Sequence, residues 1–377
     1  MKKVGVIGGG QLAWMMAKEA KSRDLELIVQ TPNPDDPAAR ITENSILGEI
    51  ADANATQRLG DRCDVITFEN EFVNLEELKV LAQQGICFRP DLASLEPLLD
   101  KADQRRYLQQ IGLPVPRFQV IEKNGKITSE YGFPVVLKAR RHGYDGRGTF
   151  ILNSQNELES LWNRLERPSM LIEEFIPFTC ELAIMAARGA NGQTVVYPVV
   201  KTEQENQVCR RIFAPANIPV EVSAEIDRIA ATLLDRLQVV GIFGIELFLT
   251  PENRVLVNEI APRTHNSGHF TLDACDISQF AMQLEAVTGM PLKAPKMTCK
   301  AAVMVNLLGL EERSPYLAKR EQLAEIPGAF VHWYGKNESR PGRKLGHVTV
   351  LLEEESQSRA IAQQIESIWY GRSAIEN

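Results

Sequence analysis

Short apolar runs alternate with amphipathic stretches along the first 95 residues of the chain. The apolar runs are rich in Val, Ile and Leu, as in buried strands, whereas the amphipathic stretches repeat apolar residues at helical spacing. The runs cover 3–7, 25–30 and 64–68, and the amphipathic stretches cover 12–22 and 75–84. Strands and helices in this alternation form a doubly wound parallel sheet. We therefore expect such a domain at the start of the chain.

The order of elements becomes mixed after residue 95. A polar helix is expected over 100–110, because "GLPVP" directly after it stops a helix. The following elements are strands, helices at 226–237 and 277–287, a β-hairpin over 241–260, more short strands and a closing helix at about 356–368. The chain is thus predicted to be α/β and α+β. The expected domains are the parallel-sheet domain 1–95, a mixed domain 96–290 and a small mixed C-terminal domain 291–377.

Composition agrees with a soluble globular protein of several domains. The chain has 377 residues, of which 44% are apolar and 24% are charged. Its formal net charge of −7 provides no basic field, so we expect no nucleic-acid partner. An anionic substrate must then be held by local cations or by a metal.

The cysteines and the N-terminus are typical of a cytoplasmic protein. The six cysteines are scattered without a CxxC pair, which favours free thiols over disulfides or a zinc site. The apolar N-terminal stretch is broken by glycines and a glutamine, so we expect neither a signal peptide nor a membrane span.

A glycine-rich loop follows the first expected strand. Residues 8–13, "GGGQLA", fit the G-x-G-x-x-A pattern with which dinucleotide-binding proteins hold a phosphate at a helix N-terminus. A nicotinamide site also needs an acid at the end of the second strand, where this chain has Gln30. The pattern therefore disfavours NAD. It leaves two interpretations, an anion site for another substrate or a tight turn without a ligand.

A second glycine-rich stretch reads "KARRHGYDGRG". Lys138 ends an apolar strand, and Gly143, Gly146 and Gly148 follow within the next ten residues. Flexible backbone amides beside several cations suit a triphosphate. The stretch is not a Walker loop, because the lysine precedes the glycines and no G-K-[ST] occurs. A hairpin turn with a solvated basic rim explains this pattern equally well.

Two glutamates are expected to face each other in the predicted hairpin. If 251–254 is a four-residue loop, Thr250 pairs with Val255. Glu246 then lies opposite Glu259, with Cβ atoms about 4.5–5.5 Å apart, where two carboxylates repel each other. A bridging divalent cation relieves this repulsion, and oxygen ligands favour Mg²⁺. The alternative is an exposed hairpin with solvated acids.

A dense polar segment completes this strand. Residues 258–269, "NEIAPRTHNSGH", contain two of the five histidines of the chain, together with an acid, an arginine, two asparagines and a serine. So many polar groups at the end of an apolar strand indicate a functional pocket.

Together these motifs resemble those of the ATP-grasp superfamily. The strings "GGGQL", "TFENE", "GYDGRG", "NEIAPRTHNSGH" and "RPGRKLGH" are similar to those of the 5-(carboxyamino)imidazole ribonucleotide synthases of purine synthesis, over nearly the whole chain. The resemblance implies an ATP-grasp fold, in which ATP lies between two α+β lobes, and a homodimer. It also implies that the chain uses ATP with Mg²⁺, which Mn²⁺ can replace.

The family reaction joins 5-aminoimidazole ribonucleotide, bicarbonate and ATP, and gives the carbamate, ADP and phosphate. ATP first converts bicarbonate into carboxyphosphate, which releases CO₂ beside the exocyclic amine of the ribonucleotide. An enzyme of this kind must neutralise phosphoryl charge and exclude water from a labile intermediate.

The resemblance also assigns roles to individual residues. The ATP-binding residues would be Lys101, Lys138, the flap Gly143, Tyr144, Asp145, Gly146, Arg147, Gly148 and Thr149, the inter-lobe strand Glu173, Glu174, Phe175 and Ile176, and Glu181, Gln204, Asn258 and Glu259. The Mg²⁺ ligands would be Glu246 and Glu259. The catalytic residues around bicarbonate and carboxyphosphate would be Arg263, His265 and Asn266, with Tyr144, Asp145 and Arg147 from the flap. The ribonucleotide would be held by Gln11, Leu12, Glu69, Lys336, Arg343 and Lys344.

Three places depart from the family pattern. Gln204 stands where a histidine is common, Ala13-Trp14 replaces Gly-Arg, and Thr149 replaces a frequent glutamine. None of these changes touches the paired acids or the "RTHNSGH" segment.

Three other functions compete with this interpretation. Another ATP-grasp ligase on a phosphoribosyl substrate, such as the formate-dependent glycinamide ribonucleotide transformylase, would share the first loop and the metal hairpin. A nicotinamide oxidoreductase is disfavoured by Gln30, and an inactive binding module by the presence of Lys138, Glu246 and Glu259.

Overall fold

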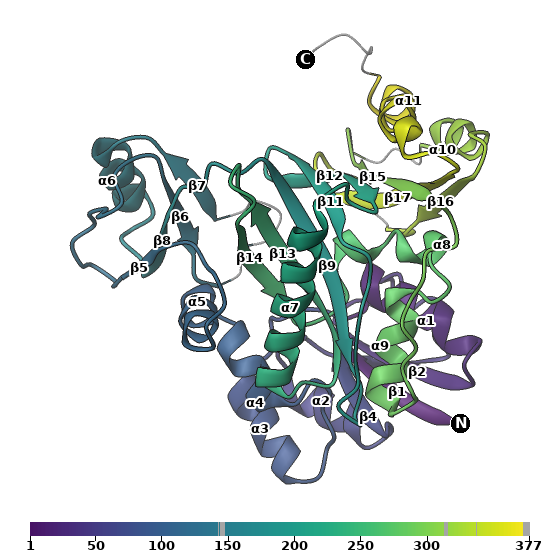
Figure 1. The fold of residues 1–377 in the computed structure, drawn as a ribbon. Coiled ribbons are helices and arrows are strands. Elements are labelled where there is room, and N and C mark those ends of the chain that lie inside the picture. Colours follow the sequence, from purple (N-terminus) through teal and green to yellow (C-terminus); the bar gives the residue numbers. More distant parts are fainter. Residues whose placement is uncertain (142, 144–147, 313–315, 337, 372–377) are drawn as a thin grey trace.

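The computed structural model describes residues 1–141, 143, 148–312, 316–336 and 338–371, and three β-sheets organise this part of the chain (Figure 1). The predicted flap residues Tyr144, Asp145, Gly146 and Arg147 lie outside the described residues. No helix within the described ranges is long and apolar enough to cross a membrane. The six cysteines are free thiols.

The first sheet is parallel, in the order β3-β2-β1-β4. Its elements are β1 (Lys2–Ile7), α1 (Gln11–Lys21), β2 (Leu25–Thr31), β3 (Asn44–Leu47), α2 (Ala53–Gly60), β4 (Val65–Phe68) and α3 (Leu75–Gln83). Helix α1 packs with Val4 and Val6 on one face, and α2 and α3 pack with Ile66 and Phe68 on the other. The predicted doubly wound sheet is confirmed.

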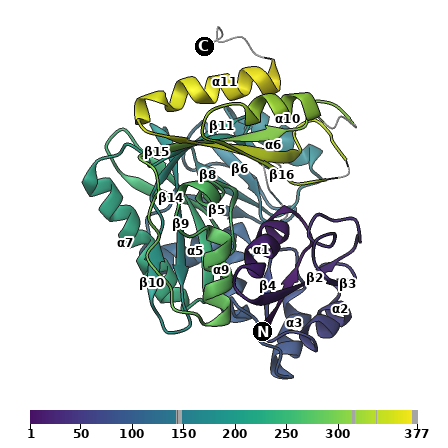
Figure 2. The same ribbon diagram turned by 90° about the vertical axis from the view of Figure 1, so that its right-hand side faces the viewer.

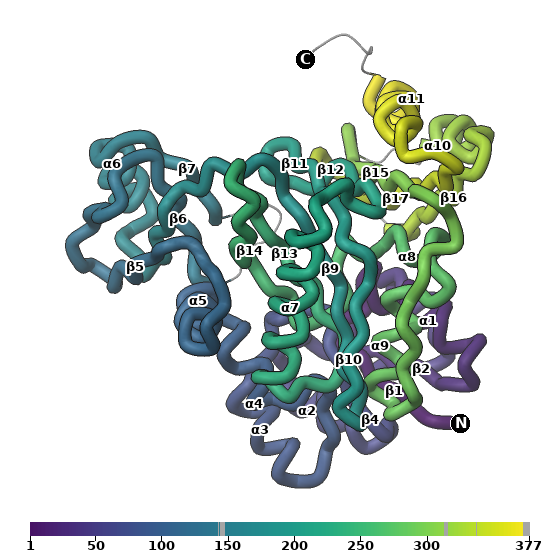
Figure 3. The backbone as a smooth tube through the Cα atoms, in the orientation of Figure 1, coloured from purple at the N-terminus to yellow at the C-terminus, as the bar shows by residue number. Residues whose placement is uncertain are grey.

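A small antiparallel sheet forms a separate lobe, in the order β5-β8-β6-β7. It is preceded by α4 (Leu92–Leu95) and α5 (Lys101–Gln110), and consists of β5 (Phe118–Ile121), β6 (Val135–Ala139), β7 (Thr149–Leu152), α6 (Gln155–Arg164) and β8 (Met170–Glu174). Trp162 and Leu158 of α6 pack against the strands. Figure 3 shows that this lobe stands beside the rest of the chain and that the segment after β8 leads into β9.

The third sheet has nine strands, in the order β14-β13-β9-β11-β12-β15-β17-β16, with β10 paired to β9. Its strands are β9 (Cys180–Arg188), β10 (Thr194–Val196), β11 (Val200–Glu205), β12 (Val208–Ala214), β13 (Gly241–Leu249), β14 (Val255–Ala261), β15 (Ala301–Leu308), β16 (Ala329–Trp333) and β17 (Lys344–Leu352). Because β12 pairs with β15, the C-terminal strands continue the large sheet. The predicted domain limits at residues 95 and 290 stay a prediction.

Helices cover both faces of this sheet and join it to the first domain. Helix α7 (Val220–Leu237) packs on one face. Helix α9 (Gln279–Thr288) packs on the other, where Met282 and Ala286 face the sheet while Phe280 and Leu284 contribute to the core around α1 and β1. Of the remaining helices, α10 (Leu317–Ala324) and α11 (Ser358–Tyr370) lie near the C-terminal strands (Figure 2), and α8 (Thr271–Ala274) lies beside β17 (Figure 1). The first sheet, the large sheet and the C-terminal strands therefore meet around α8 and α9.

Candidate active site

The hairpin of β13 and β14 contains a β-bulge. The predicted pairing of Thr250 with Val255 is wrong, because Leu249 pairs with Val255 in the structure. The register then shifts by one residue, so that Glu246 lies opposite Glu259 as predicted. Asn258 is the extra residue, without a partner of its own in the ladder.

The bulge directs two consecutive side chains to the same side of the sheet. Neighbouring residues of a regular strand point to opposite faces. Here the Asn258 amide nitrogen lies 3.4 Å from Glu246 Oε2, and its oxygen accepts a hydrogen bond of 3.0 Å from Lys138. Glu259 faces Glu246 as well. The site thus gathers two carboxylates and one amide, all with oxygen atoms that suit a hard cation.

Two predicted lysines lie beside this group. Lys101 Nζ of α5 is 2.5 Å from Glu259 Oε2. Lys138 Nζ of β6 is 2.7 Å from Glu173 Oε2, and both side chains are buried. Lys101 and Lys138 belong to different elements on the small-lobe side. Both predicted phosphate ligands nevertheless lie next to the paired acids of the large lobe.

Glu173 balances the buried charge of Lys138. Burial by itself would raise the pKa of Glu173, but the cations of Arg105 and Lys138 outweigh it and lower this pKa to about 2. Burial also lowers the pKa of Lys138, and Glu173 opposes this effect. The side chain of Glu173 therefore positions Lys138, whereas the predicted role of residues 173–176 in ATP binding concerned their backbone.

The paired acids titrate differently. Burial, followed by the charges of Glu259 and Glu181, raises the pKa of Glu246 to about 7. Burial acts in the same direction on Glu259, but Lys101 outweighs it and lowers the pKa of this acid. Glu246 thus holds its proton more tightly than a free carboxyl does, and Glu259 less tightly. A divalent cation would stabilise both in the charged form, so the residues present fit Mg²⁺.

The residues predicted to bind the nucleotide lie around the paired acids. Burial raises the pKa of Glu181 to about 7 against the opposing charge of Lys138. Gln204, which stands where the family commonly has a histidine, lies on the neighbouring strand and donates a 3.2 Å hydrogen bond to Glu181. Phe175 and Ile176 lie in the link between the small lobe and β9, and Glu174 pairs with Arg117 at 2.7 Å.

The described ends of the flap adjoin Lys138. Thr149 pairs with Lys138 across β6 and β7. Gly148 has a φ of +81°, and a Cβ there would lie 2.8 Å from the side chain of Ala139. Gly143 is close, since its Cα is 3.9 Å from the position of that added Cβ. Glycine is therefore required at 148, where the chain turns back beside Lys138.

The polar segment after β14 reaches back to the paired acids. His265 Nδ1 accepts a hydrogen bond from the Ser267 backbone N–H at 3.3 Å. In a neutral ring the proton is then on Nε2, which lies 3.6 Å from Glu246 Oε1. Asn266 exchanges two amide hydrogen bonds with Asn306, of 2.9 and 2.8 Å. Of these predicted catalytic residues, His265 directly faces the acid pair.

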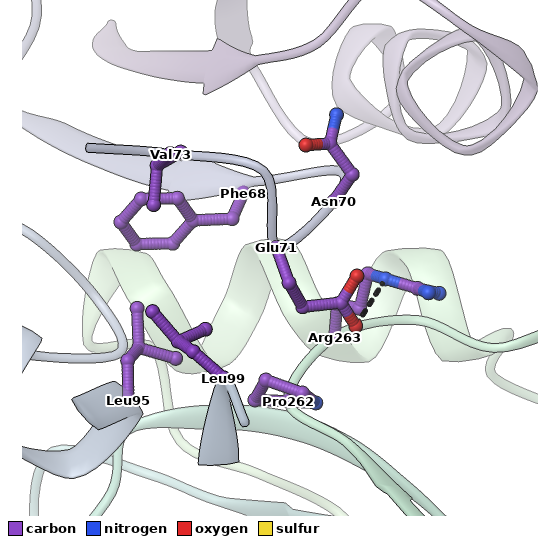
Figure 4. A pocket seen from close by; sticks show the side chains of 8 residues that line it. All are labelled: Phe68, Asn70, Glu71, Val73, Leu95, Leu99, Pro262 and Arg263. Atoms are coloured by element: carbon purple, nitrogen blue, oxygen red, sulfur yellow. Dashed lines mark ion pairs between the residues drawn. The ribbon is translucent and has the colours of Figure 1, made fainter. Parts of the chain in front are cut away.

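Arg263 is tied to the first domain. Its Nε lies 2.9 Å from Glu71 Oε1, on the loop after β4, and both residues line a small pocket together with Phe68 and Leu99 (Figure 4). This ion pair was not foreseen from the sequence, although "TFENE" contains both Glu69 and Glu71. It brings the loop after β4 to the segment that follows β14.

The first glycine loop is filled by an acid of the chain itself. The Glu69 carboxylate accepts hydrogen bonds of 2.6 Å from Gly10 N–H and 2.9 Å from Leu12 N–H, at the N-terminus of α1. A Cβ at Gly10 would lie 2.6 Å from Glu69 Oε1, which explains the glycine. Gln30 is fully buried and accepts from Thr56 at 2.8 Å. The loop thus binds a carboxylate where a dinucleotide fold would bind phosphate.

The predicted ribonucleotide residues gather at the same junction. Lys336 Nζ donates to Gln11 Oε1 and to the Lys344 carbonyl, at 2.7 Å each. Gln11 and Leu12 begin α1 beside Glu69. Arg343 lies on the loop before β17, where it pairs with Glu338 at 3.3 Å. The first domain and the C-terminal strands therefore supply one common surface.

Sequence reasoning missed two residues of α5. Arg105 bonds to the buried Glu173 and to the carbonyl of Val257, and Gln104 bonds to the backbone of Ile260. The available signal was helical spacing, because Arg105 follows Lys101 by four residues and shares its face.

Three segments of the chain match known domains. Residues 1–97 match the ribonucleotide synthetase preATP-grasp domain, 106–280 the ATP-grasp domain, and 302–361 the phosphoribosylaminoimidazole carboxylase C-terminal domain.

Whole-length relatives agree with these matches. The chain is 50% identical over 379 residues to an N5-carboxyaminoimidazole ribonucleotide synthase of Synechococcus elongatus, covering 98% of this chain and 96% of that protein. It is 51% identical over 382 residues to that of Synechocystis sp., covering 97% and 98%. A crystal structure of the N5-carboxyaminoimidazole synthase of Aspergillus clavatus, in complex with ADP and 5-aminoimidazole ribonucleotide, superposes with a TM-score of 0.91 at 28% identity over 98% of this chain and 99% of that one. The chain belongs to the N5-carboxyaminoimidazole ribonucleotide synthase family of ATP-grasp ligases.

Proposed function

We propose that the site between the two lobes uses MgATP and bicarbonate to carboxylate 5-aminoimidazole ribonucleotide. The observation that carries this proposal is the 3.6 Å approach of His265 Nε2 to Glu246, which joins the segment after β14 to the acid pair. Phosphoryl transfer and carboxylation can then occur side by side, without release of carboxyphosphate to water. The Aspergillus clavatus relative was crystallised with ADP and 5-aminoimidazole ribonucleotide, which supports the choice of ATP and the ribonucleotide as substrates.

ATP lies between the lobes in this proposal. Lys101 and Lys138 neutralise the phosphate oxygens, and the flap from Gly143 to Thr149 covers them. The linker at 173–176 contacts the adenine through its backbone, and Glu181 with Gln204 contacts the ribose. Since Lys138 is buried and balanced by Glu173, its ammonium is fixed before ATP arrives, which reduces the reorganisation needed in the transition state.

Glu246, Glu259 and the Asn258 oxygen would hold Mg²⁺, and Mn²⁺ suits the same oxygen ligands. When bound, the cation neutralises negative charge on the β- and γ-phosphates. The residues of the chain then have two tasks here. They fix the geometry of the oxygen ligands, and they keep Lys101 and Lys138 within reach of the same phosphates.

Bicarbonate is held by Arg263, His265 and Asn266 in this proposal. A bicarbonate oxygen attacks the γ-phosphorus of ATP, and the bond from phosphorus to ADP breaks. The carboxyphosphate formed releases CO₂ and phosphate. The exocyclic amine of the ribonucleotide attacks CO₂ and loses a proton to this phosphate, which gives the carbamate. His265 Nε2 donates a hydrogen bond to the anion, and Arg263 provides charge. The homodimer implied by the resemblance stays a proposal.

The test measures ADP release from the wild-type chain in four mixtures, with or without the ribonucleotide and with bicarbonate present or depleted. We expect rapid ADP release only when both are present, with one carbamate formed for each ADP. Formate in place of bicarbonate distinguishes the transformylase alternative. ADP release that needs formate, or that ignores bicarbonate, would overturn the proposal.

Arg343 offers a separate test of the ribonucleotide surface. Arg343→Ala should raise the KM for the ribonucleotide roughly ten- to a hundredfold, the effect of losing a charged hydrogen bond of about 1.5–3 kcal/mol. The KM for ATP should stay within about twofold, because the described ATP-binding residues lie on other elements. Arg340→Ala, an exposed arginine of the same loop, serves as control. An equal rise in both KM values would show that Arg343 does not bind the 5′-phosphate.

A further inference from the structure

Strand β14, which carries Asn258 and Glu259, is an edge strand. It is the first strand in the order of the large sheet, so its outer edge has no strand partner in the described part of the chain. Backbone groups on such an edge need other partners, and the neighbouring strand β13 fixes the register of β14 from one side only. The metal-binding prediction depends on this register, because a shift of one residue would turn Glu259 to the opposite face.

The Pro114 carbonyl accepts a hydrogen bond of 2.8 Å from the Val257 N–H at this edge. Helix α5 supplies further partners through two side chains. The Gln104 amide donates to the Ile260 carbonyl at 3.0 Å and accepts from the Ile260 N–H at 2.9 Å. One side-chain amide thus replaces the donor and the acceptor that a neighbouring strand would offer. Gln104 is almost fully buried, with 3% of its surface exposed, so water does not compete for these bonds.

Arg105 holds the bulge itself. Its guanidinium donates to the carbonyls of Val257, at 3.2 Å, and of Asn258. It also pairs with Glu173, the partner of Lys138. Arg105 is 2% exposed and connects the small lobe to the large lobe.

These contacts form a closed ring of hydrogen bonds and ion pairs beside the predicted metal-binding acids. Arg105 binds the bulge and Glu173, Glu173 binds Lys138, and Lys138 donates back to Asn258 of the bulge. We infer that Gln104 and Arg105 are positioning residues that fix the bulge, and thereby the distance between the metal-binding acids and the phosphate-binding lysine. This inference rests on the proposed function, since it assigns the acids to the metal and Lys138 to ATP.

The main test is Gln104→Leu, which keeps the side-chain volume and removes both hydrogen bonds to Ile260. We expect the dissociation constant of Mn²⁺, measured by electron paramagnetic resonance with ADP present, to rise about tenfold, because the strand that carries Asn258 and Glu259 loses its support from α5. The Mg²⁺ concentration for half-maximal activity should rise equally, and kcat should fall. The KM for the ribonucleotide should stay within about twofold, because the residues predicted to bind it lie on other elements.

Arg105→Lys is the second variant, because it keeps a positive charge beside Glu173 but cannot contact both bulge carbonyls. It should also weaken Mn²⁺ binding. If Gln104→Leu fails to fold, Arg105→Lys decides the inference. The control is Arg106→Ala, the next residue of the helix, which is exposed and pairs with Asp103 at 2.9 Å.

Wild-type affinity for Mn²⁺ in the folded variants would overturn the inference, even if their melting temperature falls. That result would mean that Gln104 and Arg105 only stabilise the fold. The proposed function is judged separately, by carboxylation in the wild-type chain. Because Mn²⁺ binding is measured without turnover, it tests the inference even if the wild type proves inactive toward the ribonucleotide.

Discussion

A Glu259→Gln enzyme is expected to release no ADP, whether or not bicarbonate and the ribonucleotide are present. The amide keeps the shape of the side chain but removes the charge that a divalent cation needs. It also leaves Lys101 without the carboxylate that now lies 2.5 Å from its ammonium. Loss of metal-assisted charge neutralisation costs several kcal/mol of transition-state stabilisation, so the rate should fall by a factor on the order of 10³ or more.

A coupled assay for ADP measures this loss, and Glu252→Gln provides the matched control. Glu252 lies in the loop of the same hairpin and is exposed, so its substitution should leave the rate unchanged. Near-normal ADP release by Glu259→Gln would remove this acid from the phosphoryl-transfer site. Near-normal ADP release by both variants would show that the hairpin tolerates a neutral residue at both positions.

The pairing of Glu246 with Glu259 could be predicted from the sequence, but its geometric cause could not. Counting from the hairpin loop gave the right partners with the wrong register at Thr250. The bulge at Asn258 corrects the register, and it depends on contacts with α5, which lies about 150 residues earlier in the chain. Such a contact between distant segments leaves no local pattern in the strand itself.

The first glycine loop gives a similar lesson. Its pattern identifies a helix N-terminus with backbone N–H donors, and it left open an anion site for a substrate or a tight turn without a ligand. In the structure these N–H groups donate to the side chain of Glu69, which no spacing within residues 8–13 could indicate. The local pattern predicts the backbone N–H donors of this loop. The acceptor, Glu69, is brought to them by the tertiary fold.

The same limit applies to whole elements. Most strands and helices were predicted within a few residues, because apolar periodicity is a local property. Helices α2, α4, α6, α8 and α10 were not predicted, and α7 begins at Val220 instead of residue 226. The expected C-terminal domain is continuous with the large sheet, because β12 and β15 pair across nearly 90 residues of chain. Periodicity shows that a strand exists and does not show which strand is its neighbour.

His265→Ala should separate the two halves of the reaction. The ring contacts Glu246 through Nε2, while its other nitrogen is held by Ser267. Its loss leaves the predicted metal ligands and both lysines in place, so MgATP should bind with near-normal affinity. Carbamate synthesis should fall by about 10²-fold or more, as when a positioned hydrogen-bond donor is removed from a developing anion. The ADP that is still formed should exceed the carbamate, since poorly held carboxyphosphate is lost to water.

Two further variants define the cause of this uncoupling. Ser267→Ala removes the hydroxyl 2.9 Å from His265 Nδ1 but keeps the backbone N–H that also binds this nitrogen, so its defect should be milder. Arg263→Ala should uncouple as His265→Ala does, because the proposal assigns its charge to the same bicarbonate. The ratio of carbamate to ADP, measured in the same samples, shows whether each variant is uncoupled. A His265→Ala enzyme with the normal rate and one carbamate per ADP would show that the histidine only orders the turn after β14. The expected excess of ADP would place it at the bicarbonate.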